Sequence, residues 1–339
     1  MQFLQEFPLQ NLNTFGLDVK SKFYKEFSSM EELLQIINDP IYKENKVLIL
    51  GGGSNLLFTK DFDGLVLKNN IKGIIRKDAG SNQVIVTSGA GEVWHDLVLD
   101  CVNQGLGGLE NLSLIPGTVG ASPMQNIGAY GVEIKDVFEQ LEAVDRYTGE
   151  IFRFTSNECR FGYRTSVFKT TLKDKFIITS VSFRLNRIPT FNTSYGAINQ
   201  TLEEMGVKEL SIKAISEAVC QIRESKLPNP AKIGNAGSFF KNPEISLEKF
   251  ERIKSGYPDI VNYPTAPGMT KIPAGWLIEK CGWKGKTLGN AGVHTNQALV
   301  LVNLGKAKGA DILQLAENVK ASVRDVFGID LEIEVNVIN

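Results

Sequence analysis

The sequence has few of the residues that hold metals or form disulfides. It contains four cysteines and two histidines in 339 residues, and no two cysteines form a CxxC pair. A structural zinc site needs clustered Cys and His ligands, so we expect no metal site. We interpret Cys101, Cys159, Cys220 and Cys281 as reduced, buried thiols. His95 lies beside the apolar stripe of a predicted helix, and we expect it to be structural.

The sequence also lacks a bias in charge or hydropathy. Lys and Arg total 37 against 38 Asp and Glu, and hydrophobic residues make up 42% of the chain. This balance gives no reason to expect a nucleic acid or membrane partner. No apolar run is long enough to cross a membrane, and Glu6 and Pro8 interrupt what would be a secretion signal. These features predict a cytoplasmic protein, and its length predicts two or three domains.

Two glycine-rich segments, residues 51–55 and 114–131, do not match the common phosphate-binding motifs. The pattern GxGxxG from Gly51 would need glycine at position 56, where the chain has Leu56. A Walker A loop ending near Gly285 would need glycine at position 280, where the chain has Lys280. A Rossmann or P-loop domain is therefore not expected. Two loops able to cradle anions predict a diphosphate ligand in another architecture.

Local patterns predict several helices and strands. Ser29 and Glu32 form a capping box before a helix that ends at Pro40. The apolar run 47–50 predicts a buried strand that leads into the first glycine segment. Further strands are predicted at 84–86, 137–147, 176–185 and 331–338, and helices at 93–105, 212–222 and 312–326, the last closed by Gly328.

Several motifs, in this order and spacing, resemble the UDP-N-acetylenolpyruvoylglucosamine reductase family. They are NTFG from Asn13, GGGSNLLF from Gly51, PGTVGASPMQNIGAYG from Pro116, FGYRTSVFK from Phe161, GNAGSFFKNP from Gly234 and LEIEVNVI from Leu331. The resemblance extends to the carboxyl end. It implies an FAD oxidoreductase, a UDP-N-acetylmuramate dehydrogenase of peptidoglycan synthesis. Such an enzyme uses NADPH to reduce UDP-N-acetylglucosamine enolpyruvate to UDP-N-acetylmuramate.

The resemblance also implies the fold class. It is an α+β protein with an FAD-binding region of the PCMH or vanillyl-alcohol-oxidase type, made of two α/β subdomains, and a C-terminal α/β substrate-binding domain. We expect the FAD-binding region over residues 1–188, with subdomains at about 1–65 and 66–188. A linker and helix over 189–230 precede a substrate domain over 231–339, whose last strand returns to the active site. A monomer is expected.

FAD is expected to bind noncovalently. Relatives that attach the flavin covalently have a histidine in the glycine loop, where this chain has Ser54 and Asn55. A side chain at Gly53 is expected to obstruct the approach of the phosphates. The residues that the resemblance assigns to the cofactor are Asn13, Thr14, Gly51, Gly52, Gly53, Ser54, Asn55, Leu56, Pro116, Gly117, Thr118, Gly120, Ala121, Gln125, Asn126, Gly128, Ala129, Tyr130 and Gly131.

The catalytic set implied by the resemblance is Arg164, Ser238 and Glu334. Hydride addition to an enolpyruvyl methylene leaves negative charge that a cation and a proton donor must stabilise. Arg164 offers a forked cation for the carboxylate, and Ser238 can give its proton to the basic carbon. Period-two alternation puts Glu332 on the same strand face as Glu334, so the pattern leaves both open. The family motif favours Glu334.

The remaining matching positions are expected to contact the substrate. They are Tyr163, Tyr195, Lys226, Asn242, Tyr263, Lys284 and Gln297. The segment around Tyr195 and residues 257–273 resemble a longer subclass of the family, in which a tyrosine-bearing loop closes over the substrate. Two other hypotheses stay open at this point. One is an FAD-dependent sugar or alcohol oxidase on the same fold, and the other is a sugar-nucleotide-binding module without catalysis.

Overall fold

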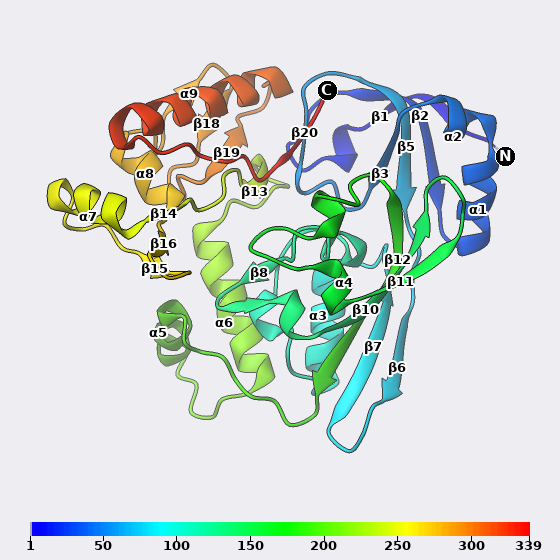
Figure 1. Ribbon diagram of the computed structural model, residues 1–339, viewed down its shortest axis with the longest axis horizontal. Helices are drawn as coiled ribbons and strands as arrows, with labels where there is room; N and C mark the ends of the chain where they lie inside the picture. Colours follow the sequence, from blue (N-terminus) through cyan, green and yellow to red (C-terminus); the bar gives the residue numbers. More distant parts are fainter. Residues whose placement is uncertain (1) are drawn as a thin grey trace. The chain divides into compact units, whose positions relative to one another are not determined.

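The computed structural model describes residues 2–339, which form two compact units (Figure 1). The first unit contains the chain up to Phe7, Ser21–Gly52 and Asp63–Ser225, and the second contains Pro8–Lys20, Gly53–Phe62 and Lys226–Asn339. This division departs from the linear one that we expected. Residues 189–225 belong to the first unit, and two short amino-terminal segments belong to the second.

One sheet of the first unit carries the amino-terminal strands. Its order is β1 (Leu4–Pro8), β2 (Lys20–Phe27), β5 (Phe62–Asn69) and β3 (Val47–Leu50), with β3 parallel to β5. As predicted, Ser29 caps α1 (Met30–Asn38), and α2 (Pro40–Glu44) begins at the proline that ends it. The predicted strand 47–50 is present but only Leu50 is buried, because β3 lies at the sheet edge.

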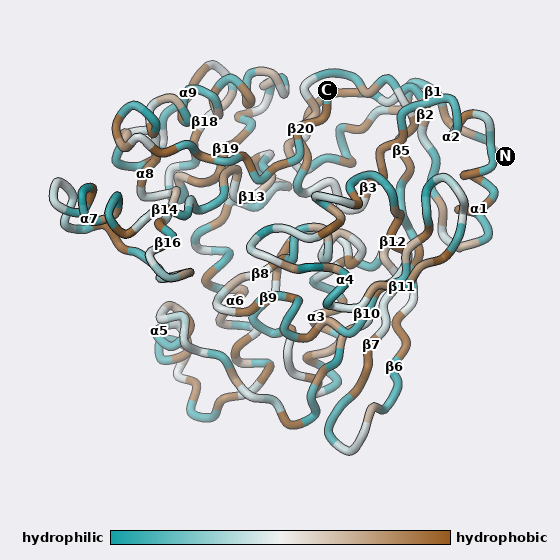
Figure 2. The backbone as a smooth tube through the Cα atoms, viewed as in Figure 1, coloured by the Kyte–Doolittle hydropathy of each residue, from teal (hydrophilic) through white to brown (hydrophobic). Residues whose placement is uncertain are grey.

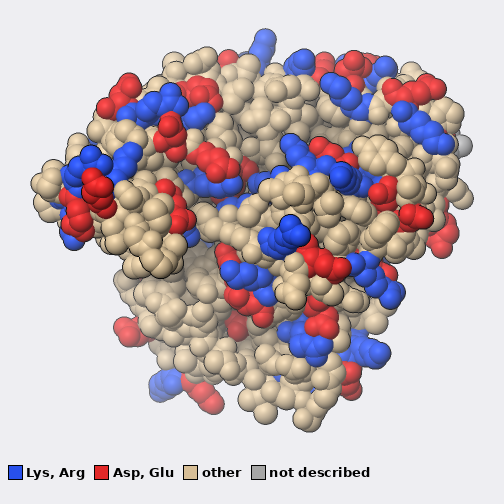
Figure 3. All heavy atoms as spheres, in the orientation of Figure 1, with Lys and Arg blue, Asp and Glu red and all other residues tan. Residues whose placement is uncertain are grey.

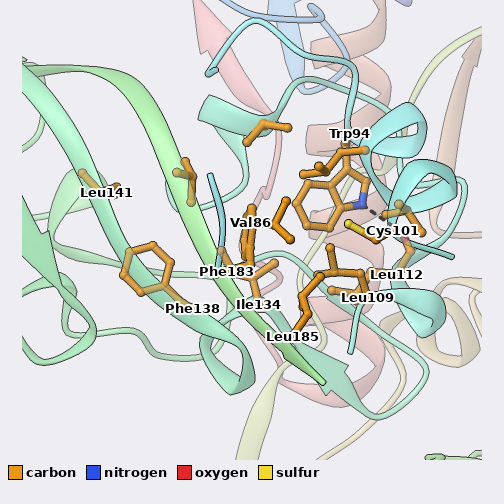
Figure 4. Packing of buried hydrophobic residues seen from close by; sticks show 14 of the residues in the cluster. Val86, Trp94, Cys101, Leu109, Leu112, Ile134, Phe138, Leu141, Phe183 and Leu185 are labelled. Carbon is orange, nitrogen blue, oxygen red and sulfur yellow. Dashed lines mark hydrogen bonds between the residues drawn. The ribbon is translucent and has the colours of Figure 1, made fainter. Parts of the chain in front are cut away.

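A second, antiparallel sheet holds the main core of the first unit. Its order is β11 (Ile151–Thr155), β10 (Phe138–Asp145), β12 (Phe176–Asn186), β7 (Gln83–Gly89) and β6 (Ile74–Asp78). The predicted helix 93–105 is α3 (Trp94–Asn103), and Figure 4 shows Trp94 packed with Phe183, Leu112 and Cys101. The indole N–H donates to the Leu112 carbonyl at 2.9 Å, which satisfies the buried polar end of the ring.

The remaining elements of the first unit are short, apart from α6. They are the 3-10 helices η2 (Glu110–Leu112), η3 (Val119–Ala121), η4 (Ile134–Asp136) and η5 (Val167–Lys169), the hairpin β8 (Gly128–Ala129) and β9 (Val132–Glu133), and the helices α4 (Ser156–Cys159), α5 (Gly196–Glu204) and α6 (Ile212–Lys226). The hydroxyls of Ser216 on α6 and Ser113 lie 2.7 Å apart and both are buried. Ile212 of α6 also belongs to the main core of this unit, so the expected linker helix packs within the first unit.

The second unit contains three small sheets. The first has the order β13 (Gly234–Ser238), β19 (Val300–Asn303), β18 (Ala291–Val293) and β17 (Thr287–Leu288). The second has the order β14 (Glu244–Ser246), β16 (Met269–Lys271) and β15 (Tyr263–Pro264). The third is the parallel pair β20 (Asn336–Ile338) and β4 (Leu56–Phe58). The pairing of β4 with β20 is the reason that residues 53–62 belong to this unit. Its 3-10 helix is η1 (Gln10–Leu12), and its α-helices are α7 (Leu247–Gly256), α8 (Ala274–Lys280) and α9 (Gly309–Phe327).

Helix α9 follows its predicted pattern except at Val326, which is 53% exposed. Ile312, Leu315, Val319 and Val323 are buried, and Figure 2 shows brown and teal alternating along the helix. Gly328 ends the helix in left-handed backbone with φ 62°, as expected for a helix-terminating glycine. The strand predicted at 331–338 is shorter than expected, since a bend at Val335 separates an isolated bridge at Ile333 from β20.

The surface carries mixed charge. Figure 3 shows basic and acidic side chains interspersed on the face in view, consistent with nearly equal totals of each sign. Within residues 2–339, no helix is both long enough and apolar enough to cross a membrane.

Candidate active site

The glycine segment after β3 meets the second glycine segment inside the first unit. A Cβ added at Gly51 would lie 2.4 Å from the Thr118 Oγ1 atom, and one at Gly52 would lie 2.8 Å from the Gly117 Cα atom. At Gly52 only glycine permits this approach of backbone to backbone, whereas at Gly51 the contact is with the Thr118 side chain. Lys68 on β5 also donates to the Gly51 carbonyl at 2.7 Å. Sequence reasoning missed this lysine, which has no motif around it.

Gly53 begins the part of the segment that belongs to the second unit. Its φ is +65°, and an added Cβ would lie 1.9 Å from the Leu12 carbonyl oxygen. The Thr14 N–H donates to the Gly53 carbonyl at 3.1 Å. The protein backbone itself therefore requires glycine at position 53. That a side chain there would also obstruct the phosphates stays a prediction.

The N–H groups of Gly52, Gly53 and Ser54 donate no hydrogen bond to any atom of residues 2–339. Successive N–H groups of this kind form a concave donor set that suits a phosphate. The segment therefore has backbone donors available for a diphosphate.

Two asparagines assigned to the cofactor have their amides engaged by protein. Asn13 is buried, donates to the Leu9 carbonyl at 2.9 Å and accepts from the Leu17 N–H at 3.0 Å. Asn126 is fully buried, donates to Glu133 at 3.0 Å and to the Gly162 carbonyl at 3.1 Å, and accepts from the Lys135 N–H at 3.2 Å. These side chains shape the loops.

The segment 114–131 has an irregular backbone of the kind that ligand loops use. Leu114, Asn126 and Tyr130 adopt positive φ values of 59°, 46° and 50°, which are uncommon for residues other than glycine. Gly120 lies against Ala90, where an added Cβ would come within 2.6 Å of the Ala90 Cβ atom. Such strain persists only where neighbouring groups hold it, and it is often found at functional sites.

Arg164 lies at the tip of a tight turn in the first unit. The turn is closed by reciprocal hydrogen bonds between Gly162 and Thr165 at 3.1 and 3.3 Å. Arg164 has φ 52°, and its Nη2 donates to the Gly128 carbonyl at 2.7 Å. Its guanidinium lies 5.5 Å from the centre of the Tyr163 ring. These contacts bring Arg164 beside the segment predicted to hold the flavin.

A second arginine, Arg223 on α6, lies close to the same segment and was not predicted. Its Nε donates to the Leu114 carbonyl at 3.2 Å, and its side chain interacts with Tyr130. Burial raises the pKa of Tyr130 and lowers the pKa of Arg223, and the charge of Arg164 lowers the latter further. Tyr130 packs edge-on against Tyr195, with 5.2 Å between ring centres. The only sequence signal was a charge beside the apolar stripe of α6.

Ser238 and Glu334 are neighbours in the second unit. Ser238 ends β13 after a bulge in which Asn235 accepts from the Gly237 N–H at 2.9 Å. The following residues pair with the carboxyl-terminal segment, since the Glu334 N–H donates to the Phe239 carbonyl at 2.9 Å. Asn55, from the glycine segment, donates to the Glu334 carbonyl at 3.4 Å. The structure thus brings one predicted cofactor residue and two predicted catalytic residues together.

The structure distinguishes the two glutamates that the sequence pattern left open. Glu332 is exposed and forms an ion pair with Lys241. Glu334 is half-buried and hydrogen-bonded through its backbone to the residue after Ser238. Of the two glutamates, Glu334 is therefore the one whose backbone pairs next to Ser238.

The predicted substrate residues are distributed over both units. Tyr163 and Tyr195 lie in the first unit and are 37% and 43% exposed. In the second unit, Asn242 accepts from the first N–H of α8, Ala274, at 2.9 Å. Three others there occupy different surroundings: Lys226 at the end of α6, Tyr263 exposed on β15, and Gln297 accepting from the Leu299 N–H at 3.3 Å.

Lys284 is the predicted substrate residue with the strongest competing contact. Its Nζ lies 3.0 and 3.1 Å from the two carboxylate oxygens of Glu279. An exposed ion pair of this kind contributes little stability and can open. To bind an anionic group of a substrate, Lys284 would have to break its ion pair with Glu279.

Comparison with known proteins identifies the two parts of the chain. Residues 229–338 match the C-terminal domain of UDP-N-acetylenolpyruvoylglucosamine reductase, and residues 22–155 match an FAD binding domain. The chain is 50% identical to the UDP-N-acetylenolpyruvoylglucosamine reductase of Amoebophilus asiaticus over the whole of both chains. It is 48% identical to that of Pseudomonas putida over 99% of each.

Solved structures agree with these matches. The UDP-N-acetylenolpyruvylglucosamine reductase of Thermus caldophilus is 25% identical, with a TM-score of 0.70 over the whole of both chains. A p-cresol methylhydroxylase structure, at 12% identity and a TM-score of 0.50, covers 96% of this chain and 84% of its own length. The second likeness shows the fold alone, and it confirms the expected PCMH-type architecture. The chain belongs to the UDP-N-acetylenolpyruvoylglucosamine reductase family.

Proposed function

We propose that the chain is the FAD enzyme that reduces UDP-N-acetylglucosamine enolpyruvate to UDP-N-acetylmuramate with NADPH, as a cytoplasmic monomer of peptidoglycan synthesis. The observation that carries this proposal is the backbone pairing that sets Glu334 next to Ser238. Family membership indicates the reaction. The pairing supports the assignment of Ser238 as the proton donor and of Glu334 as an acid next to it.

The two glycine segments would hold FAD, with the N–H groups of Gly52, Gly53 and Ser54 donating to its diphosphate. When bound, FAD would accept a hydride from NADPH and supply it to the methylene carbon of the substrate. Tyr163, Tyr195, Lys226, Asn242, Tyr263, Lys284 and Gln297 would contact the sugar nucleotide.

Arg164, Ser238 and Glu334 would stabilise the charge that hydride addition creates. As hydride adds to the methylene carbon, the double-bond pair moves to the neighbouring carbon and delocalises into the carboxylate. The Arg164 guanidinium would pair with that carboxylate through two parallel N–H donors. Ser238 would then give its hydroxyl proton to the neighbouring carbon. Glu334 would hold a proton at the carboxylate or return one to Ser238.

The test is the separation of the two half-reactions in Ser238→Ala. Reduction of the flavin by NADPH should stay within a few fold of wild type, because no proton reaches the substrate in that step. Reoxidation by the enolpyruvyl substrate should slow by roughly 10² to 10⁴. Stopped-flow absorbance of the flavin follows both steps.

Each other outcome of this experiment has a definite meaning. Equal slowing of both steps would assign Ser238 to shaping the pocket, and an unimpaired second step would assign the proton to another group. Ser238→Cys should recover part of the lost rate, since the thiol keeps a transferable proton. A wild-type protein whose flavin is reduced by an alcohol or sugar and reoxidised by oxygen would instead be an oxidase.

A further inference from the structure

Leu114 begins the second glycine segment in left-handed backbone, with φ 59°. This conformation brings the Cβ of any residue other than glycine close to backbone and is unfavourable for leucine. It persists only where neighbouring groups hold it. Groups outside the segment must therefore hold Leu114 in this conformation.

Side chains from two helices hold both backbone groups of Leu114. Its N–H donates to the Nδ1 atom of His95 on α3 at 2.9 Å, and its carbonyl accepts from Nε of Arg223 on α6 at 3.2 Å. Three residues further on, the Gly117 carbonyl accepts from the Trp94 N–H at 3.0 Å. At this end of the segment, the start of α3 thus holds two places and α6 holds one.

The held residues lie next to those that meet the first glycine segment. Gly117 and Thr118 are the residues against which Gly52 and Gly51 pack. Arg223 also interacts with Tyr130 near the far end of the segment. A shift at Leu114 would therefore move the backbone on which the two glycine segments meet.

We propose that His95 and Arg223 are positioning residues that hold the segment 114–131 in its binding conformation, and that His95 does so only as the neutral imidazole. This inference rests on the proposed function in one respect, namely that the segment binds FAD. An imidazole whose Nδ1 accepts a hydrogen bond cannot carry a proton there. Protonation of His95 would turn the acceptor into a second donor facing the Leu114 N–H.

The surroundings of His95 set the direction of the pH effect. The charged groups that face it are Asp96 on its own helix and Arg223 and Glu224 on α6. Burial is the largest influence and lowers the pKa of His95; Asp96 and Glu224 oppose the shift and Arg223 adds to it. Because the folded pKa lies below the unfolded one, the stabilisation is complete above the usual histidine pKa of about 6.5. It is lost as the pH falls through the folded value.

The test compares three variants for their FAD dissociation constant, read from the fluorescence of released flavin. His95→Leu removes the acceptor and should raise the constant roughly 5- to 100-fold, the range for one buried N–H left unpaired. His95→Asn offers an oxygen near the position of Nδ1 and should stay within a few fold of wild type. The matched control is His294→Leu, because His294 accepts from the Asn296 N–H at 3.3 Å in the second unit. It should leave FAD binding unchanged.

The acid dependence gives a second readout that a general loss of packing would not produce. Wild type should release flavin increasingly as the pH falls through the lowered pKa of His95, whereas His95→Asn should be less sensitive because an amide does not titrate. If His95→Leu fails to fold, the difference in acid sensitivity between wild type and His95→Asn still tests the proposal. Equal acid sensitivity of wild type and His95→Asn, or wild-type affinity in His95→Leu, would overturn the inference. A wild-type protein that binds no FAD would contradict the proposed function instead.

Discussion

The two units position their candidate catalytic residues by different means. In the first unit, Arg164 lies on a turn next to loops that are held by buried side chains, chiefly Asn126. In the second, Ser238 and Glu334 are positioned by the backbone register of strand β13 and the carboxyl-terminal segment. The first arrangement relies on a few side chains in addition to the backbone bonds that close the turn, whereas the second relies mainly on backbone groups.

This difference predicts how each unit responds to substitution. A loop held by one side chain can move when that side chain is removed, because nothing else satisfies its backbone groups. A strand register is held by several N–H to carbonyl bonds that no substitution other than proline removes. Substitutions near Ser238 should therefore alter turnover or stability without displacing the site. Substitutions near Arg164 should alter turnover or stability and also displace the site.

The largest effect is expected from Glu334→Gln, which leaves the backbone pairing intact. If the carboxyl group takes part in proton transfer, turnover should fall roughly 10² to 10⁴-fold with little change in thermal stability. The matched control is Glu332→Gln, two residues away on an exposed ion pair, which should cost less than threefold, roughly the worth of such a pair. Steady-state kcat measures both, and the opposite ranking would reject Glu334 as the acid.

Gly53→Ala should be an exception to the tolerance of substitution that we expect where backbone bonds hold the structure. The new Cβ would lie 1.9 Å from the Leu12 carbonyl, so the backbone itself must move. We expect a loss of roughly 4 kcal/mol of stability, as for other severe clashes in packed sites, together with loss of bound flavin. Flavin absorbance and thermal unfolding measure the two effects.

Gly16→Ala separates strain from collision in that experiment. Gly16 has the same φ of +65° but nothing within 4 Å of an added Cβ. It should cost only the strain of left-handed backbone, about 1–2 kcal/mol. Equal losses in the two variants would mean that backbone conformation, and not the contact with Leu12, requires glycine at 53.

Two buried asparagines, one in each unit, allow the two arrangements to be compared directly. Asn126 and Asn235 are both buried and each makes three side-chain hydrogen bonds to protein. Alanine at either position should cost roughly 2–4 kcal/mol of stability. Turnover should fall roughly 10- to 100-fold more in Asn126→Ala, since Arg164 would lose its alignment. Similar turnover losses in the two variants would show that both units depend on side chains alike.

Much of the local structure could be predicted, and the exceptions have a common cause. Ser29, the α9 stripe and Gly328 follow rules that act within a few residues, and the structure confirms them. His95 was expected to be structural, and its bond to the Leu114 N–H agrees. The strand predicted at 331–338 is shorter than expected because its course depends on its pairing with Phe239 and Phe240. The helix predicted at 212–222 is present as α6, and its packing depends on distant contacts such as that of Ser216 with Ser113.

The sequence by itself determined that Gly328 closes α9, that α1, α3, α6 and α9 are helices, and which family motifs are present. These follow from the sterics of single residues and from apolar periodicity along one element. Only the tertiary structure decided that Glu332 pairs with Lys241 while Glu334 lies beside Ser238. The two glutamates are equivalent in a repeating strand, and what separates them is contact with residues almost a hundred positions away in the chain. Such contacts depend on how strands and helices pack, which no local pattern records.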